Sequence, residues 1–247
     1  MKLTKEQKAA RKAAFRAMTP ADKLDYIVSY YKWPILLTVI LLLILGSAAH
    51  RRLTEKEPVL YLALADVVAG ENLEDALTTG FLRAEGVNSS RQEVYLYRDL
   101  YLSDNADVVN HEYAYASRMK VMGAIQANKL DLVLMNREAY DLCSRNGYLM
   151  VLDAWLPALD AAEALSPYLV SNMVILEDNT IAYQLGEAAS HELVTEEVKN
   201  GLDVSRLPLI ASAGFPEATY LGVLANCERL DACADYLAYL SAGANQP

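Results

Sequence analysis

Apolar positions along the chain form one long uninterrupted run and several short ones. The long run, residues 33–49 (WPILLTVILLLILGSAA), has seventeen residues and no charge. A helix of this length, at about 1.5 Å per residue, just crosses the hydrocarbon core of a bilayer. Trp33 at its start, with tyrosines before it, and Arg51 and Arg52 after its end are typical of membrane interfaces. We therefore expect a transmembrane helix at residues 33–50.

The segment before this run, residues 1–32, is predicted to be a basic arm that contains an amphipathic helix. Thr19, Pro20 and Asp22 are helix-start signals: a capping hydroxyl, a proline at the first position and an acidic first turn. Apolar side chains then recur at helical spacing, at Leu24, Ile27, Val28 and Tyr31. We expect this helix to lie on the surface of the lipid bilayer until Pro34 redirects the chain. A nucleic-acid partner is not expected, because membrane orientation alone requires a basic flank and no recognition motif accompanies it.

Charge is distributed unequally about the apolar run. Residues 1–32 carry a net charge of +5 and the chain from His50 onward carries −15, for a total of −10. The positive-inside rule therefore predicts a single-pass protein of the cell membrane with a cytoplasmic N-terminus. We expect residues 51–57 to be a linker and residues 58–247 to form an extracellular α/β domain. Cleavage after Ala49, at a run of small residues, would instead make the apolar run a signal peptide, and this alternative stays open.

Within residues 58–247, strand-like runs alternate with helical patterns. Apolar runs predict buried strands at 59–65 and 130–135, and alternating polarity predicts a half-buried strand at 93–102. A hairpin is predicted from 172–176 and 180–186, and LPLIA and TYLGVLA are predicted as late strands. Helices are predicted at 72–84, 112–128, 137–145 and 228–240. Such alternation predicts an α/β sheet with helical crossovers.

Two of these stretches resemble a known family. The sequence KLDLVLMNREAYDLCSRNGYLMVLDAWLP resembles type 2 solute-binding proteins, also called periplasmic-binding proteins, and TYLGVLANCERLDACADYLAYL is similar to their closing strand and helix. The front end, TPADKLDYIVSYYKWPILLTVILLLILG, looks like the anchor of single-span proteins of Gram-positive anaerobes that carry a shortened binding-protein-like outer domain. The resemblance implies a fold and a location but no ligand. The outer domain is short for two lobes, and no lipid-attachment cysteine follows the apolar run.

The sequence lacks the common signatures of catalysis, metal binding and cofactor binding. The motifs G-x-G-x-x-G, G-x-x-x-x-G-K-[ST], G-x-S-x-G and H-E-x-x-H do not occur. None of the three histidines has a second ligand four residues on, so we expect no metal, no cofactor and no enzymatic activity. Cys143 is expected to be a core residue. Cys227 and Cys233 can form a disulfide if Cys227 lies in the turn before the last helix, and their spacing permits this bond without requiring it.

Strand ends provide the best candidates for ligand-binding residues. Asp66 follows the first buried strand, and Asn136 and Arg137 lie where a later strand meets a helix. Open α/β sheets bind ligands beyond the carboxyl ends of their strands. Arg137 suits a carboxylate ligand, although an ion pair with Asp141, four residues on, is its competing role. Asp66 and Tyr95 are the candidates for a cationic or sugar-like ligand, although a tyrosine stripe such as that of Tyr95 more often packs a sheet.

Two functions remain as hypotheses. In the first, the outer domain captures or senses a small solute or peptide without catalysis, with a membrane transporter or complex as a further partner. In the second, it is a degenerate binding fold that acts as an interaction module of a membrane protein complex. A pocket between two lobes would favour the first hypothesis, and its absence would favour the second.

Overall fold

The chain divides between Glu55 and Lys56 into an N-terminal unit and an α/β domain. The computed structural model of the protein describes residues 12–54, 56–103 and 111–243, apart from the side chains at 21, 24–31 and 48–54. The predicted linker 51–57 overlaps the end of the N-terminal helix and the start of the first strand.

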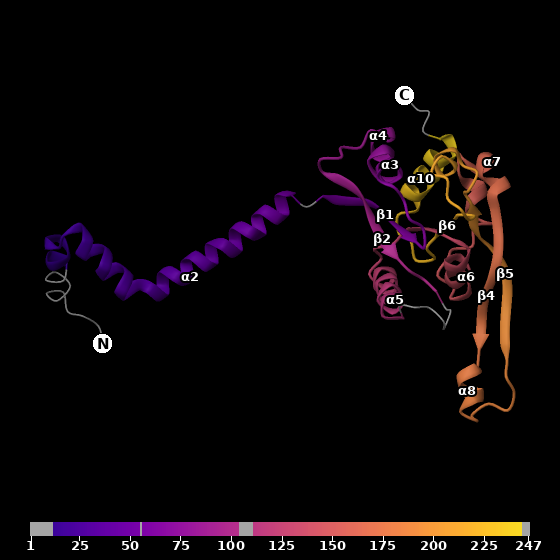
Figure 1. The fold of residues 1–247 in the computed structure, drawn as a ribbon, viewed down its shortest axis with the longest axis horizontal. Helices are drawn as coiled ribbons and strands as arrows, with labels where there is room; N and C mark the ends of the chain where they lie inside the picture. Colours follow the sequence, from indigo (N-terminus) through magenta and orange to yellow (C-terminus); the bar gives the residue numbers. More distant parts are fainter. Residues whose placement is uncertain (1–11, 55, 104–110, 244–247) are drawn as a thin grey trace. The chain divides into compact units, whose positions relative to one another are not determined.

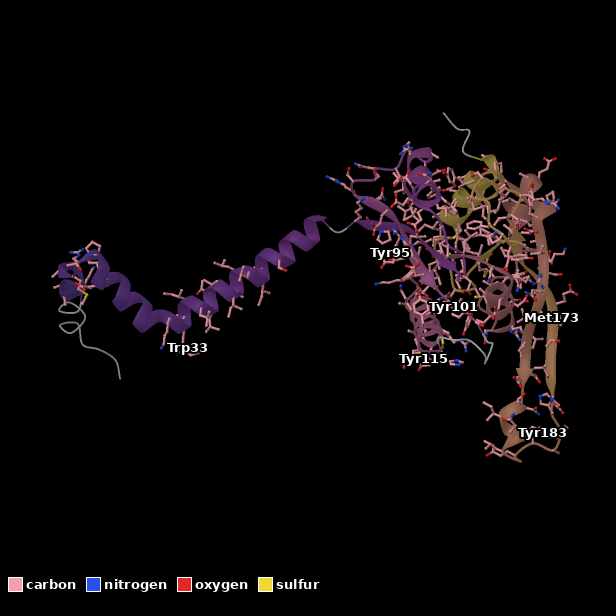
Figure 2. The ribbon with its side chains drawn as sticks, in the orientation of Figure 1. Trp33, Tyr95, Tyr101, Tyr115, Met173 and Tyr183 are labelled. Atoms are coloured by element: carbon pink, nitrogen blue, oxygen red, sulfur yellow. The ribbon has the colours of Figure 1, made fainter. Side chains whose placement is uncertain are left out.

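The N-terminal unit contains one long helix, α2 (Pro20–Thr54, 35 residues). It begins where the capping signals predict, because the backbone N–H of Asp22 donates to Oγ1 of Thr19 at 3.3 Å. The expected break at Pro34 is wrong: the helix continues through this proline, whose carbonyl accepts the hydroxyl of Thr38 at 2.8 Å. The described side chains from residue 32 to 47 are exposed, Trp33 among them (Figure 2). Across the described part of the chain, no helix is both long enough and apolar enough to cross a membrane.

The α/β domain is built on one mixed sheet of six strands, which confirms the α/β class (Figure 1). In sheet order the strands are β2 (Gln92–Leu100), β1 (Glu57–Ala65), β3 (Leu132–Met135), β6 (Tyr220–Val223), β5 (Leu193–Asp203) and β4 (Leu169–Asp178). Strands β2, β1 and β3 are parallel, whereas β6, β5 and β4 each pair antiparallel with the strand before them in this order. The parallel half of the sheet therefore joins an antiparallel half at the β3–β6 pair.

Side chains of β1 alternate between the two faces of the sheet, and each face has its own apolar core. Leu60, Leu62 and Leu64 pack with residues of α4 (Phe81–Ala84) and α10 (Leu230–Ala242). Ala63 and Ala65 belong to a second core with residues of α5 (His111–Gln126) and α6 (Arg137–Arg145). Both faces are thus covered by helices, which explains why β1 and β3 are continuous apolar runs.

Most predicted helices are present near their predicted bounds. The stretch predicted at 72–84 consists of α3 (Glu71–Asp75), a π-helical turn η1 (Ala76–Gly80) and α4. Helix α6 begins at an Asn136 cap, whose side-chain oxygen accepts the N–H of Ala139 at 2.9 Å, and it ends before Gly147, which has a φ of 68°. Helices α5 and α10 match the predictions at 112–128 and 228–240 within two residues at each end.

Two predictions in the second half of the domain are wrong. The segment 180–186, predicted as a strand, contains α8 (Thr180–Gln184), and the strand that pairs with β4 is β5. The side chain of Asp178 accepts the backbone N–H of Thr180 at 2.8 Å, and this turn leads into a helix instead of a tight hairpin. The LPLIA segment contains a short helix, α9 (Pro208–Ala211), because Pro208 occupies a first helical position that its fixed φ suits.

Strands β4 and β5 form a long hairpin that extends beyond the rest of the α/β domain, with α8 at its tip (Figure 1). At its base, Leu202 and Asp203 of β5 pair with β6, and α6 packs against β4. The short segments η2 (Leu156–Ala158), α7 (Ala162–Leu165) and η3 (Ser166–Tyr168) lead into the hairpin.

Candidate functional site

Asp66 stands at the carboxyl end of β1 in a left-handed backbone conformation, with a φ of 54°. Its backbone N–H donates to the carbonyl of Leu100, at the end of β2, at 2.8 Å. Its Oδ2 accepts the N–H of Leu102 at 2.9 Å. The carboxylate is therefore held in place by the segment that follows the neighbouring strand, while the chain turns away from the sheet.

Asn136 lies beside Asp66 because β1 and β3 are adjacent parallel strands. The N–H of Asn136 donates to the carbonyl of Ala65 at 3.3 Å, and its side chain caps α6. Asp66 and Asn136 line one pocket of about 290 Å³ together with residues of the loop 215–219. Two of the four predicted ligand residues are thus brought together at the strand ends.

The pocket joins acidic groups to an aromatic ring. The pKa of Asp66 is raised to about 6, chiefly by burial and also by the nearby carboxylate of Glu138, while the hydrogen bond from the N–H of Leu102 acts in the lowering direction. Glu138 itself accepts a hydrogen bond from the hydroxyl of Ser103. Phe215 and Glu217 also line the pocket. A pocket lined by an ionised Asp66, by Glu217 and by the ring of Phe215 suits a small cation better than an anion.

Arg137 does not line this pocket. Its Nε lies 3.0 Å from Oδ1 of Asp141, and its guanidinium lies over the rings of Tyr140 and Tyr220 at 5.7 and 5.6 Å from their centroids. The hydrogen bond that its guanidinium donates to the hydroxyl of Tyr220 raises the pKa of Arg137 most, and the hydrogen bond to Asp141 and the charge of that carboxylate raise it as well. Arg137 thus has the competing role set out above, as the ion-pair partner of Asp141 on its own helix.

Tyr95 lies on β2, at a different part of the sheet from the Asp66 pocket. Its ring contacts those of Tyr61 and Tyr97, with centroids 5.7 and 4.8 Å away, as the sheet-packing alternative predicts. It also lines a separate surface pocket of about 540 Å³ together with Lys56, Arg98 and other residues. The structure therefore separates Tyr95 from Asp66 and Asn136.

The structure also shows the surroundings of the three cysteines and of the potential metal ligands. Cys143 lies on the buried side of α6 and belongs to the core, as expected, and burial raises the pKa of its thiol to about 12. All three cysteines are free thiols. In the described ranges, no cluster of three or more histidine, cysteine or carboxylate side chains could hold a metal ion.

The distal part of the β4–β5 hairpin carries a second candidate surface, which the sequence analysis missed. Its large apolar side chains are exposed, and Tyr183 marks their position at the tip (Figure 2). We call those nearest the tip the hairpin-tip residues: Leu176, Ile181, Tyr183, Leu185, Leu193 and Val194; Met173 is also exposed but lies in the middle of β4 (Figure 2). Ile181 is the most exposed of them, at 74%. A cluster of large exposed apolar residues on one projecting element is typical of an interaction surface.

The same hairpin is strongly acidic. Its exposed carboxylates are Glu177, Asp178, Glu187, Glu192, Glu196 and Glu197. The sequence contains no lysine or arginine between Arg145 and Lys199. This charge gap was a readable signal in the sequence, and it marks the segment that carries the hairpin-tip residues.

Comparisons with protein-family models, curated proteins and solved structures find no match for this chain.

Proposed function

We propose that the α/β domain is an interaction module of a membrane protein complex and that the β4–β5 hairpin is its contact surface. The observation that carries this proposal is the cluster of exposed hairpin-tip residues at the end of a projecting element. Scattered single apolar residues on a surface need no explanation, but seven within one hairpin do. The single six-stranded sheet supports the same choice, because a solute held between two lobes would need a second lobe beside it.

The chemistry of the hairpin defines the partner. The hairpin carries exposed apolar side chains together with exposed carboxylates, and such a surface is complementary to a protein that presents apolar side chains together with lysine or arginine. A second copy of the hairpin is disfavoured as the partner, because the exposed carboxylates of the two hairpins would repel each other. An anionic lipid surface is disfavoured for the same reason. The proposed partner is therefore a different protein whose binding surface carries both apolar and basic side chains.

The proposed location of the module is the outer face of the cell membrane. Support comes from the uncharged run at 33–49, from the positive charge before it and from the exposed apolar side chains of α2 between residues 33 and 45. The free energy of apolar side chains is lower in lipid than in water. The apolar run of the sequence continues to Ala49, beyond the side chains that the structure describes in this helix. The resemblance to shortened, anchored type 2 solute-binding proteins agrees with this location and remains a prediction.

The experiment introduces a photo-reactive amino acid at Ile181 of the full-length chain, in membranes of cells that express it. We expect one crosslinked species of defined mass, because the side chain at this position would lie inside the contact. The matched control places the same amino acid at Tyr115, which is also exposed but lies on α5. Raising the salt concentration to about 0.5 M should lower the crosslinking yield, because salt screens the attraction between the carboxylates of the hairpin and a basic partner.

A second pair of substitutions tests whether the apolar residues themselves make the contact. Leu185→Ser together with Leu193→Ser should abolish the crosslink from Ile181, while circular dichroism of the purified variant stays that of the wild type. Both leucines are exposed, so their loss should not disturb the core. A crosslink of equal yield from Tyr115, or one that survives both substitutions, would contradict the proposal.

A second function, capture of a small organic cation, is favoured by the pocket at Asp66. About 290 Å³ is near the lower end of ligand pockets, and Asp66, Glu217 and Phe215 are all among the residues that line this one. We propose choline as the probe and 3,3-dimethylbutanol, which has the same shape without the charge, as its control. Calorimetry should detect choline alone, and Asp66→Asn should weaken its binding about tenfold. Equal binding of the two probes, or no binding of choline, would rule out this function.

A further inference from the structure

The thiols of Cys227 and Cys233 lie next to each other at the start of the last helix. Cys227 is in the turn before α10, where its N–H donates to the carbonyl of Leu224 at 3.1 Å, and Cys233 lies in the first turns of α10. Their sulfur atoms are 3.5 Å apart. A disulfide bond is about 2 Å long, so a small side-chain movement would bring the two sulfurs to bonding distance. The condition set by the sequence, that Cys227 precede the helix, is met.

We propose that Cys227 and Cys233 are a redox pair that closes to a disulfide when the protein meets an oxidant of the disulfide class. Cys227 attacks the oxidant, forms a mixed disulfide and releases one thiol. Cys233 then attacks the sulfur of Cys227 and releases the second thiol. The two cysteines lose two electrons and two protons, and the oxidant gains both as its two thiols. The proposal does not depend on the proposed function.

The surroundings of the two thiols assign them different roles. Cys227 is partly exposed, so it is the thiol that an oxidant can reach. Its Sγ donates to Oδ1 of Asp131 at 3.3 Å. Cys233 is fully buried, and its contact with Cys227, its burial and the charge of Asp131 together raise its pKa. Because the thiolate is the attacking form, closure by Cys233 should be the slow step. Cys143 takes no part, since it is buried in the core on the other face of the sheet.

The experiment counts thiols in the purified full-length chain after incubation with mixtures of oxidised and reduced glutathione. After acid quenching and denaturation, N-ethylmaleimide labels every free thiol for mass spectrometry. We expect three labels on the reduced protein and one, on Cys143, after oxidation, with a Cys227–Cys233 peptide found by mapping. The oxidised protein should melt about 5 °C above the reduced one, because the bond restricts the unfolded chain.

Two single variants separate the roles of the thiols. Cys233→Ser should retain glutathione on Cys227 as a stable adduct, whereas Cys227→Ser should acquire little glutathione at all. The wild-type measurement alone can overturn the proposal, whatever the stability of these variants. It does so if three labels persist at the most oxidising mixture or if mapping finds Cys143 in the bridge.

Discussion

The ring of Tyr140 lies so close to the backbone of Gly201 that a β-carbon at position 201 would stand 2.7 Å from three of the ring and hydroxyl atoms. Tyr140 also stacks on Tyr220, with centroids 4.8 Å apart, and its hydroxyl donates to Oδ1 of Asn200 at 2.8 Å. The amide of Asn200 in turn donates to Oγ of Ser144 at 2.7 Å. These buried contacts join α6 to the base of β5, and so they hold the root of the projecting hairpin.

Gly201→Ala should therefore destabilise the domain by about 2 kcal/mol, because the added methyl group must displace the Tyr140 ring in a packed core. Urea unfolding followed by circular dichroism measures this change. Gly70→Ala is the matched control, since a β-carbon at that position meets nothing within 4 Å, and its effect should stay within about 1 kcal/mol, which allows for the N-cap position that Gly70 occupies in α3. Equal effects of the two substitutions would show that the contact with Tyr140 does not constrain the fold.

A buried ion pair should contribute far more to stability than an exposed one in the same domain. Asp131 is only 1% exposed, and its carboxylate accepts the N–H of Tyr61 at 2.9 Å and pairs with Arg229 at 3.1 Å. Asp131→Ala leaves both donors without this acceptor and should cost about 3 kcal/mol. Asp153→Ala breaks the exposed pair with Lys199 and should cost about 0.5 kcal/mol or less. Unfolding of both variants in urea compares them, and similar losses would contradict the burial argument.

The sequence pattern predicted the elements whose burial is uniform. Strands β1 and β3 are largely buried and read as continuous apolar runs, so both could be predicted near their observed bounds. Asp66 and Asn136 were each predicted at the carboxyl end of a strand, and the structure places them in one pocket because β1 and β3 are adjacent parallel strands. Asn136 as a helix cap is a local signal that tertiary structure did not change.

The hairpin was misread because most of it has no core to face. Residues 193–198 of β5 are exposed or half-buried and include two glutamates, so their pattern resembles a loop, and their pairing with β4 is what makes them a strand. The wall of the pocket at 215–219 was missed for a different reason. It is a loop far along the chain, and only the tertiary fold brings Phe215 and Glu217 to the strand ends.

The membrane topology predicts a specific pattern of proteolysis. Protease added to intact cells should remove the chain after His50 and leave the basic arm protected, because the positive-inside rule places the arm in the cytoplasm. Antibodies against tags at the two ends measure which part survives, and permeabilised cells, in which both parts are cut, are the control. Protection of both parts in intact cells would refute the topology. A mature N-terminus at His50 would show that the apolar run is a cleaved signal peptide.

The raised pKa of Asp66 makes the stability of the domain depend on pH in a defined direction. In the folded state the carboxyl has a pKa of about 6, against 3.8 for an ordinary aspartate. The folded state therefore holds this proton more tightly than the unfolded state does. Its stabilising effect is fully present below about pH 4 and is lost as the pH rises through about 6. Asp66→Asn removes the charge, and asparagine tolerates the left-handed backbone at this position.

The variant should accordingly melt about 3 °C above the wild type at pH 7 and at nearly the same temperature at pH 4, a shift that allows for the partial exposure of the site. Thermal melts at intervals between pH 4 and pH 8 measure the difference. Asp99→Asn is the control, because Asp99 also has a positive φ, of 55°, at the end of a strand but is exposed. Its melting curve should follow that of the wild type at every pH.

If the Asp66→Asn and wild-type melting temperatures stay parallel across the range, Asp66 does not titrate there, and the small-cation function loses its charged anchor. If they diverge as expected, choline should bind the wild type more tightly at pH 7 than at pH 5, because only the ionised carboxylate attracts it.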